Sequence, residues 1–108
     1  MLILTIHLSE NKIEIMANIR DLKKDLKWLT YEVLTDCMIA KLLNEDKNDE
    51  VEDLMHEMMN QHTDLISRIN ESRRIQDKKE KREAFKAIEK DMFETADNSF
   101  KKLSEIVK

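Results

Sequence analysis

The sequence predicts an all-α fold, an elongated antiparallel three-helix bundle (up-down-up) that follows a short N-terminal arm. Its 108 residues contain no glycine and no proline, so the residues that most often form tight turns are absent. Charged residues make up 39% of the chain, and together with leucine, isoleucine and methionine they give it the composition of a strong helix former. Apolar residues also recur every three or four positions along three successive segments, which is the period of an amphipathic helix.

The first helix is expected over residues 16–44. Its apolar residues fall within a stripe about 80° wide at about 100° per residue. They are Ile19, Leu22, Leu26, Leu29, Val33, Cys37 and Ala40. Asn44 is expected to end the helix in the left-handed conformation that asparagine tolerates, and residues 44–48 have the composition of a turn.

The second helix is expected over residues 48–75. Asn48 suits the N-cap position, and the acidic residues that follow it suit the positive end of a helix. Met59 and Ile66 lie at the edge of the apolar stripe. The stripe itself comprises Val51, Leu54, Met55, Met58, His62, Leu65 and Ile69.

The third helix is expected over residues 78–107. Asp77 is expected to cap it, because Asp77 and Glu80 have the spacing of a capping box. Its stripe comprises Phe85, Ile88, Met92, Ala96, Ser99, Leu103 and Ile106. Short connections make successive helices antiparallel neighbours, so residues 1–108 are expected to form a single helical-bundle domain.

Residues 1–15 differ from the rest of the chain. Residues 1–8 are aliphatic and β-branched without a helical period, and Met16 resembles a translation start that is followed at once by a helical segment. Two alternatives stay open: residues 1–15 are an arm of the domain, or they are an extension that the native protein lacks. Neither a signal peptide nor a membrane span is predicted. A chain with one cysteine, Cys37, cannot form an internal disulfide, which favours a cytoplasmic location.

No catalytic motif is found, and the chain is expected neither to be an enzyme nor to hold a cofactor. Nucleophile elbows and phosphate-binding loops require glycine, which this chain lacks. Cys37 lies on the first apolar stripe beside Asp36, and an acidic neighbour raises the pKa of a thiol rather than activating it. Cys37 is therefore expected to be a small buried side chain of the core.

Two histidines are candidates for a metal or acid–base site. Asp53 and His56 have the carboxylate-x-x-His spacing of half a di-iron bundle site. His56 lies about 140° from the centre of its stripe, so a solvated polar face is expected and no metal ligand is assigned. His62 lies within the stripe, where it is expected to be neutral and hydrogen bonded to a neighbouring helix. A ligand or acid–base role for His62 is the alternative.

Charge is distributed unevenly along the chain, although the net charge is only −4. Residues 45–57 hold seven acids and one lysine, whereas residues 73–90 hold eight arginines or lysines and four acids. In an antiparallel bundle these segments lie at opposite ends, so the molecule should be electrically polar along its long axis. Some side chains of the basic end could contact phosphates. They are Arg73, Arg74, Lys78, Lys79 and Arg82.

The strongest functional signal is a second apolar face on the first helix. Six large side chains lie off the main stripe: Trp28, Tyr31, Leu34, Met38, Ile39 and Leu42. Two partner helices cover only about half of a helix, so either residues 1–8 fold over this face or another chain, a second copy or a different protein, covers it. The first hypothesis is a protein that acts through protein–protein association, as a coiled-coil-like homodimer. The alternative is a nucleic-acid-associated module that uses the basic end, and the third hypothesis is a bundle that binds a metal or small molecule.

Overall fold

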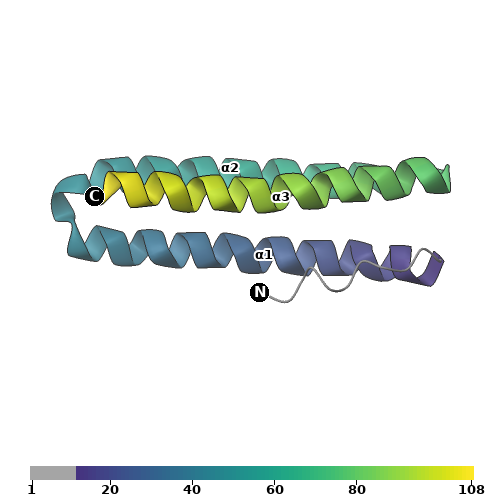
Figure 1. Ribbon diagram of the computed structural model, residues 1–108, viewed down its shortest axis with the longest axis horizontal. Coiled ribbons are helices and arrows are strands. Elements are labelled where there is room, and N and C mark those ends of the chain that lie inside the picture. The colour runs from purple at the N-terminus through teal and green to yellow at the C-terminus, as the bar shows by residue number, and fades with distance from the viewer. Residues whose placement is uncertain (1–11) are drawn as a thin grey trace.

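Three long helices lie side by side in an elongated antiparallel bundle (Figure 1). The computed structural model describes the backbone of residues 12–108 and the side chains from residue 19 onward. Helix α1 spans Lys12–Leu43, α2 spans Asn48–Ser72 and α3 spans Lys78–Ile106, and a single 3-10 turn, η2 (Glu45–Lys47), joins the first two. The molecule measures 50 × 24 × 17 Å. The predicted three-helix bundle is confirmed.

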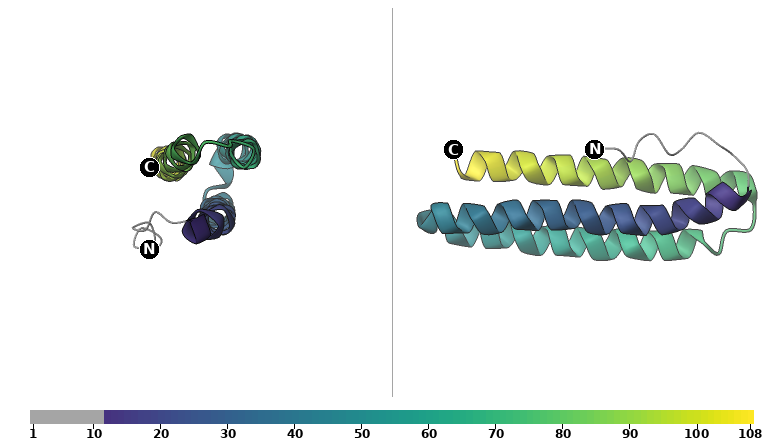
Figure 2. Two further views of the ribbon diagram at one scale, coloured as in Figure 1. Left: turned by 90° about the vertical axis from the view of Figure 1, so that its right-hand side faces the viewer. Right: turned by 90° about the horizontal axis from the view of Figure 1, so that it is seen from below.

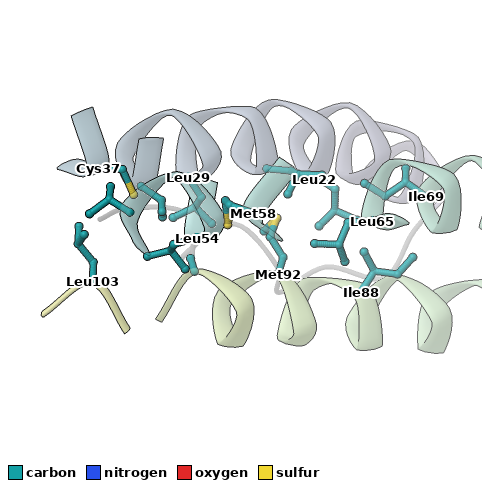
Figure 3. Packing of buried hydrophobic residues seen from close by; sticks show 14 of the residues in the cluster. Leu22, Leu29, Cys37, Leu54, Met58, Leu65, Ile69, Ile88, Met92 and Leu103 are labelled. Atoms are coloured by element: carbon teal, nitrogen blue, oxygen red, sulfur yellow. The ribbon is translucent and has the colours of Figure 1, made fainter. Parts of the chain in front are cut away.

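The core is a column of apolar side chains that runs along the axis enclosed by the three helices. Seen end-on, the helices form a triangle, so each one faces two neighbours (Figure 2). Buried side chains from all three converge between them (Figure 3). Every predicted stripe residue of α1 from Leu22 to Ala40 is buried, as are those of α3 from Phe85 to Leu103. The helical period therefore predicted the core correctly.

The second stripe is buried less completely than the other two. Val51, Leu54, Met58, Leu65 and Ile69 are buried, whereas Met55 and His62 are half-buried. These last two lie on the side of α2 that faces α1, where polar side chains also meet. The core of the bundle is therefore bordered by a partly polar contact between α1 and α2.

The beginning of α3 is capped as the sequence predicts. Asp77 has an extended backbone and its carboxylate accepts a hydrogen bond of 2.9 Å from the amide of Glu80. This bond satisfies one of the amide groups that have no partner in the first turn of a helix.

The connection between α1 and α2 differs from the prediction at both asparagines. Asn48 is not an N-cap: it is the first residue of α2 with helical backbone angles, and Lys47 precedes it. The 3-10 turn runs directly into α2, so the amide of Asn48 already donates to the carbonyl of Glu45. The Asn48 side chain therefore has no cap to form.

Asn44 ends α1 without the predicted left-handed conformation. Its φ is −137°, and both its amide and its side-chain Nδ2 donate to the carbonyl of Ala40, at 2.9 and 3.1 Å. The side chain thus satisfies a terminal carbonyl that a left-handed residue would otherwise help to satisfy.

The helix ends differ from the expected ones by a few residues. Helix α1 begins at Lys12 instead of residue 16, and α2 ends at Ser72 instead of residue 75. The hydroxyl of Ser72 donates to the carbonyl of Ile69 at 2.7 Å, and the next amides bond to carbonyls three residues back. This tightening ends α2 and turns the chain toward Asp77. The expected N-terminal arm, residues 1–8, lies outside the described residues.

Ion pairs join the helices at their exposed margins. Lys41 pairs with Glu52 at 2.8 Å, Arg68 with Asp91 at 2.7 Å, and Lys102 with Glu57 at 2.7 Å. Because the partners are partly exposed to water, which screens their attraction, each pair contributes little to stability. Packing of the apolar stripes is therefore the main source of stability.

We expect Leu26→Ala to lower the free energy of unfolding by about 2–5 kcal/mol, because it leaves a cavity in the core. Leu26 is 1% exposed, whereas Leu43 on the same helix is 78% exposed. Leu43→Ala is therefore the matched control and should change stability by less than about 0.5 kcal/mol. Urea denaturation measures both, and similar losses in the two variants would contradict the assigned phase of α1.

Removing the N-cap of α3 should lower the free energy of unfolding measurably. We expect Asp77→Ala to cost about 1 kcal/mol of unfolding free energy, whereas Asp77→Asn, which keeps an acceptor oxygen, should retain most of the stability. The comparison uses the same urea titration. Equal losses in the two variants would show that the Asp77–Glu80 hydrogen bond does not stabilise the helix.

Candidate protein-association surface

The outer face of α1 carries large apolar side chains that the bundle leaves exposed. Trp28 is 46% exposed, Tyr31 is 62% exposed and Leu42 is 79% exposed. Met38 and Ile39 are also at least half exposed. Five of the six residues predicted for the interface therefore lie on the surface of the single chain.

These side chains follow a regular spacing along the helix. Trp28, Tyr31, Thr35, Met38 and Leu42 occur at alternating steps of three and four residues, which is the spacing of a coiled-coil seam. We call these five residues the α1 seam. At about 100° per residue they lie on the side of α1 opposite to its buried stripe, so neither α2 nor α3 can cover them. Thr35 was not among the predicted interface residues, because its side chain is small and polar.

Leu34 has a different environment from the other predicted interface residues. It is half-buried and lines a groove of about 330 Å³ between α1 and α2. Met55 and Met59 line the same groove from α2. The apolar surface of α1 thus continues onto α2 through Leu34 and the exposed side chain of Met59.

One exposed apolar residue at the end of α1, Leu43, was not predicted for the interface. The helical period that places Leu42 off the main stripe also places Leu43 off it, so the sequence contained this signal. Leu43 lies at the flank of the helix, about 100° from Leu42 around the axis. It widens the apolar surface without belonging to the seam.

An ion pair borders the groove between α1 and α2. The ammonium group of Lys41 donates to Glu52 at 2.8 Å. This hydrogen bond and the positive charge of Lys41 hold the pKa of Glu52 below its usual value. His56 lines the groove beside this pair and is exposed.

His62 joins α2 to α1 through a polar contact within the bundle. Its Nδ1 lies 2.8 Å from the hydroxyl oxygen of Thr30, a residue that is only 4% exposed. Partial burial lowers the pKa of His62 because it disfavours the charged imidazolium. The prediction that His62 is hydrogen bonded to a neighbouring helix is confirmed.

Cys37 is fully buried in the core. Burial raises the pKa of its thiol, and the adjacent carboxylate of Asp36 raises it further. Both effects disfavour the thiolate, which is the reactive form of cysteine.

The carboxylate-x-x-His pair lies on the surface, since both Asp53 and His56 are exposed. Within the described part of the chain, no three histidine, cysteine, aspartate or glutamate side chains gather closely enough to hold a metal ion. A groove between α2 and α3 is lined largely by polar residues, including Gln61, Asp64 and Asn98. Such a lining differs from the mostly apolar pockets that hold small organic ligands.

The predicted phosphate-contacting residues come together at one end of the bundle, where α2 ends and α3 begins (Figure 1). Arg73, Arg74, Lys78 and Lys79 are exposed, and Arg82 is half-buried. Phe85, the aromatic residue of this segment, is buried and belongs to the core. The Phe85 ring is therefore not accessible at the basic end for a nucleic-acid base to stack on.

Comparison of the chain with protein-family models, with curated proteins and with solved structures gave no match. Among the described helices, none is both long enough and apolar enough to cross a lipid bilayer.

The lowered pKa of His62 predicts a pH dependence of stability. The unfolded chain, with a histidine pKa near 6.5, binds the proton more readily than the folded chain. The contribution of neutral His62 to the free energy of unfolding is therefore fully present above about pH 6.5, and it is lost as the pH falls below this value. We expect His62→Gln to reduce this loss in urea titrations between pH 7 and pH 5. His56→Gln, which changes an exposed histidine, is the control and should retain the wild-type loss.

Proposed function

We propose that this protein acts through protein–protein association and that its partner is a second copy of itself, bound through the outer face of α1. The observation that carries the proposal is the α1 seam, in which Trp28, Tyr31, Met38 and Leu42 lie exposed in one row. Together their exposed surfaces amount to on the order of several hundred Å². Monomeric proteins rarely leave a contiguous apolar patch of that size open to water.

The spacing of the seam favours a helix as the partner. A row with steps of three and four residues packs well against another row of the same spacing, because each side chain fits between those of the facing helix. The seam of a second copy supplies that matching row. Closed two-fold dimers are also the commonest oligomers, since one surface then serves both chains.

The residue types of the seam support an interface. Trp28 and Tyr31 belong to the types that most often dominate binding energy, because they bury a large area with few rotatable bonds. Met38 adds a flexible side chain that fits irregular surfaces, and Met59 adds another beside Leu34 in the groove between α1 and α2. Burying this face on both chains would remove most of the exposed apolar surface of α1.

The decisive test is the mass of the protein in solution, measured by analytical ultracentrifugation at tens of micromolar. We expect a dimer for the wild type and a monomer for Trp28→Glu and Leu42→Glu, because each introduces a charge into the buried seam. Neither residue belongs to the core, so both variants should keep the wild-type helical content.

The matched control is Ala87→Glu, which places the same charge at an exposed apolar position of α3. It should remain dimeric. A monomeric wild type, or seam variants that keep the dimer mass, would contradict the proposal. Adding duplex DNA or RNA in parallel tests the alternative: a shift in mass that requires Arg73 and Arg74 would instead support nucleic-acid binding.

A further inference from the structure

We propose that the two copies pack antiparallel, with the basic beginning of each α1 beside the acidic loop that follows α1 of the other copy. This inference rests on the proposed self-association and adds the orientation of the partner. It is carried by the charges at the two ends of the α1 seam, which are opposite in sign.

Cations precede the seam on the outer face of α1. Arg20, Lys24 and Lys27 are exposed, and at about 100° per residue all three lie on the same side of the helix as the seam. At the other end, Glu45 and Asp46 are exposed in the turn that follows α1. Along α1 and the turn that follows it, the chain is therefore basic, then apolar, then acidic.

The two possible orientations differ in which charges meet. A parallel pair would bring the two basic beginnings of α1 together at one end and the two acidic turns together at the other, so like charges would repel at both ends. An antiparallel pair centred on Thr35 brings the end of one α1 that carries Lys24 to the end of the other copy that carries Asp46. Only the antiparallel orientation brings opposite charges together at both ends of the interface.

The apolar part of the seam fits the same arrangement. Trp28 and Leu42 each lie seven residues from Thr35, so an antiparallel pair sets each bulky indole against a smaller leucine of the second copy. In a parallel pair the two indoles would meet at one layer while the two leucines met at another. Similar side-chain volume at the two layers that contain Trp28 and Leu42 favours the antiparallel arrangement.

The charge distribution of the whole bundle points in the same direction. The acidic segment 45–57 lies at one end of the molecule and the basic segment 73–90 at the other. Antiparallel packing along α1 sets the acidic end of one copy near the basic end of the other. Complementary fields of this kind fix orientation and accelerate association more than they add affinity.

Distances between spin labels test the orientation directly. Asn48 and Asn70 are exposed, uncharged residues near the two ends of α2. Each is replaced by cysteine and labelled in a Cys37→Ala background that retains the dimer mass. From the level of Thr35, marked on α2 by the Thr30–His62 and Lys41–Glu52 contacts, Asn70 lies about 20 Å along the axis at 1.5 Å per residue. An antiparallel dimer then separates the two Asn70 labels by roughly 40 Å along the axis.

Mixing the two labelled proteins provides the complementary measurement. In an antiparallel dimer, the label at position 48 of one copy lies near the label at position 70 of the other, so the mixture gains a shorter distance that neither sample shows alone. A parallel dimer gives the reverse, with short distances in each single sample and a long one in the mixture. That result would overturn the orientation while leaving the proposed self-association intact.

Charge reversal provides an independent readout. We expect Lys24→Glu to weaken the dimer about tenfold, because it replaces an attraction between opposite charges with a repulsion at both ends of the dimer. Asp46→Lys should weaken it similarly. The variant that carries both substitutions should recover wild-type affinity, because exchanging the two charges restores the attraction at both ends. Unchanged affinity in both single variants would contradict the antiparallel pairing, whereas a monomeric wild type would instead refute the proposed function.

Discussion

Burial of one apolar stripe on each helix is the interaction on which the rest of the structure depends. In a bundle of three, every helix has two neighbours, and these cover only the side that faces the common axis. The apolar stripes of α1, α2 and α3 all lie on the side that faces this axis, and their side chains fill the space between the helices. Helix α1 also carries a second row of large apolar side chains, and the same geometry leaves that row without a cover from α2 or α3.

The fold could be predicted from the sequence because its determinants are local and repeated. A three-to-four residue period, read over some 25 residues, specifies which side of a helix is buried whether or not the neighbours are known. The cap at Asp77 was also predictable, since its partner, Glu80, lies three residues away. The roles of Asn44 and Asn48 were predicted wrongly because the backbone conformation of each depends on how α1 and α2 are joined. Once η2 runs into α2, Asn48 has a helical backbone and no free turn to cap.

Most residues of the candidate surface could be predicted from the sequence, but Leu34 and Thr35 could not be placed correctly. The phase of α1 separates Trp28, Tyr31, Met38 and Leu42 from the core without knowledge of the neighbours. Leu34 differs because its position near the flank leaves its burial to α2, which the sequence alone does not place. Thr35 was missed because its side chain is polar, although its spacing places it within the seam. The contact between Thr30 and His62 likewise required the register of α1 against α2, which only the folded chain defines.

The arrangement of the helices leaves one apolar row of α1 exposed and places charges of opposite sign before and after it. The exposed apolar seam carries the proposed association, and the charges before and after it carry the proposed orientation. Polar contacts such as Thr30–His62 and Lys41–Glu52 hold the other side of α1 against α2. The seam is therefore presented on a helix whose other side is fixed in the bundle, and a rigid surface loses little conformational entropy on binding.

The most direct measurement of the central claim uses Trp28, the chain's only tryptophan. Its fluorescence emission and its quenching by acrylamide would be followed during dilution from hundreds of micromolar to below one micromolar. If the α1 seam is the interface, the indole is shielded at high concentration and becomes accessible on dilution, with a shift of the emission to longer wavelength. Emission and quenching that stay constant across the whole range, at the values of a half-exposed indole, would contradict an interface at the α1 seam.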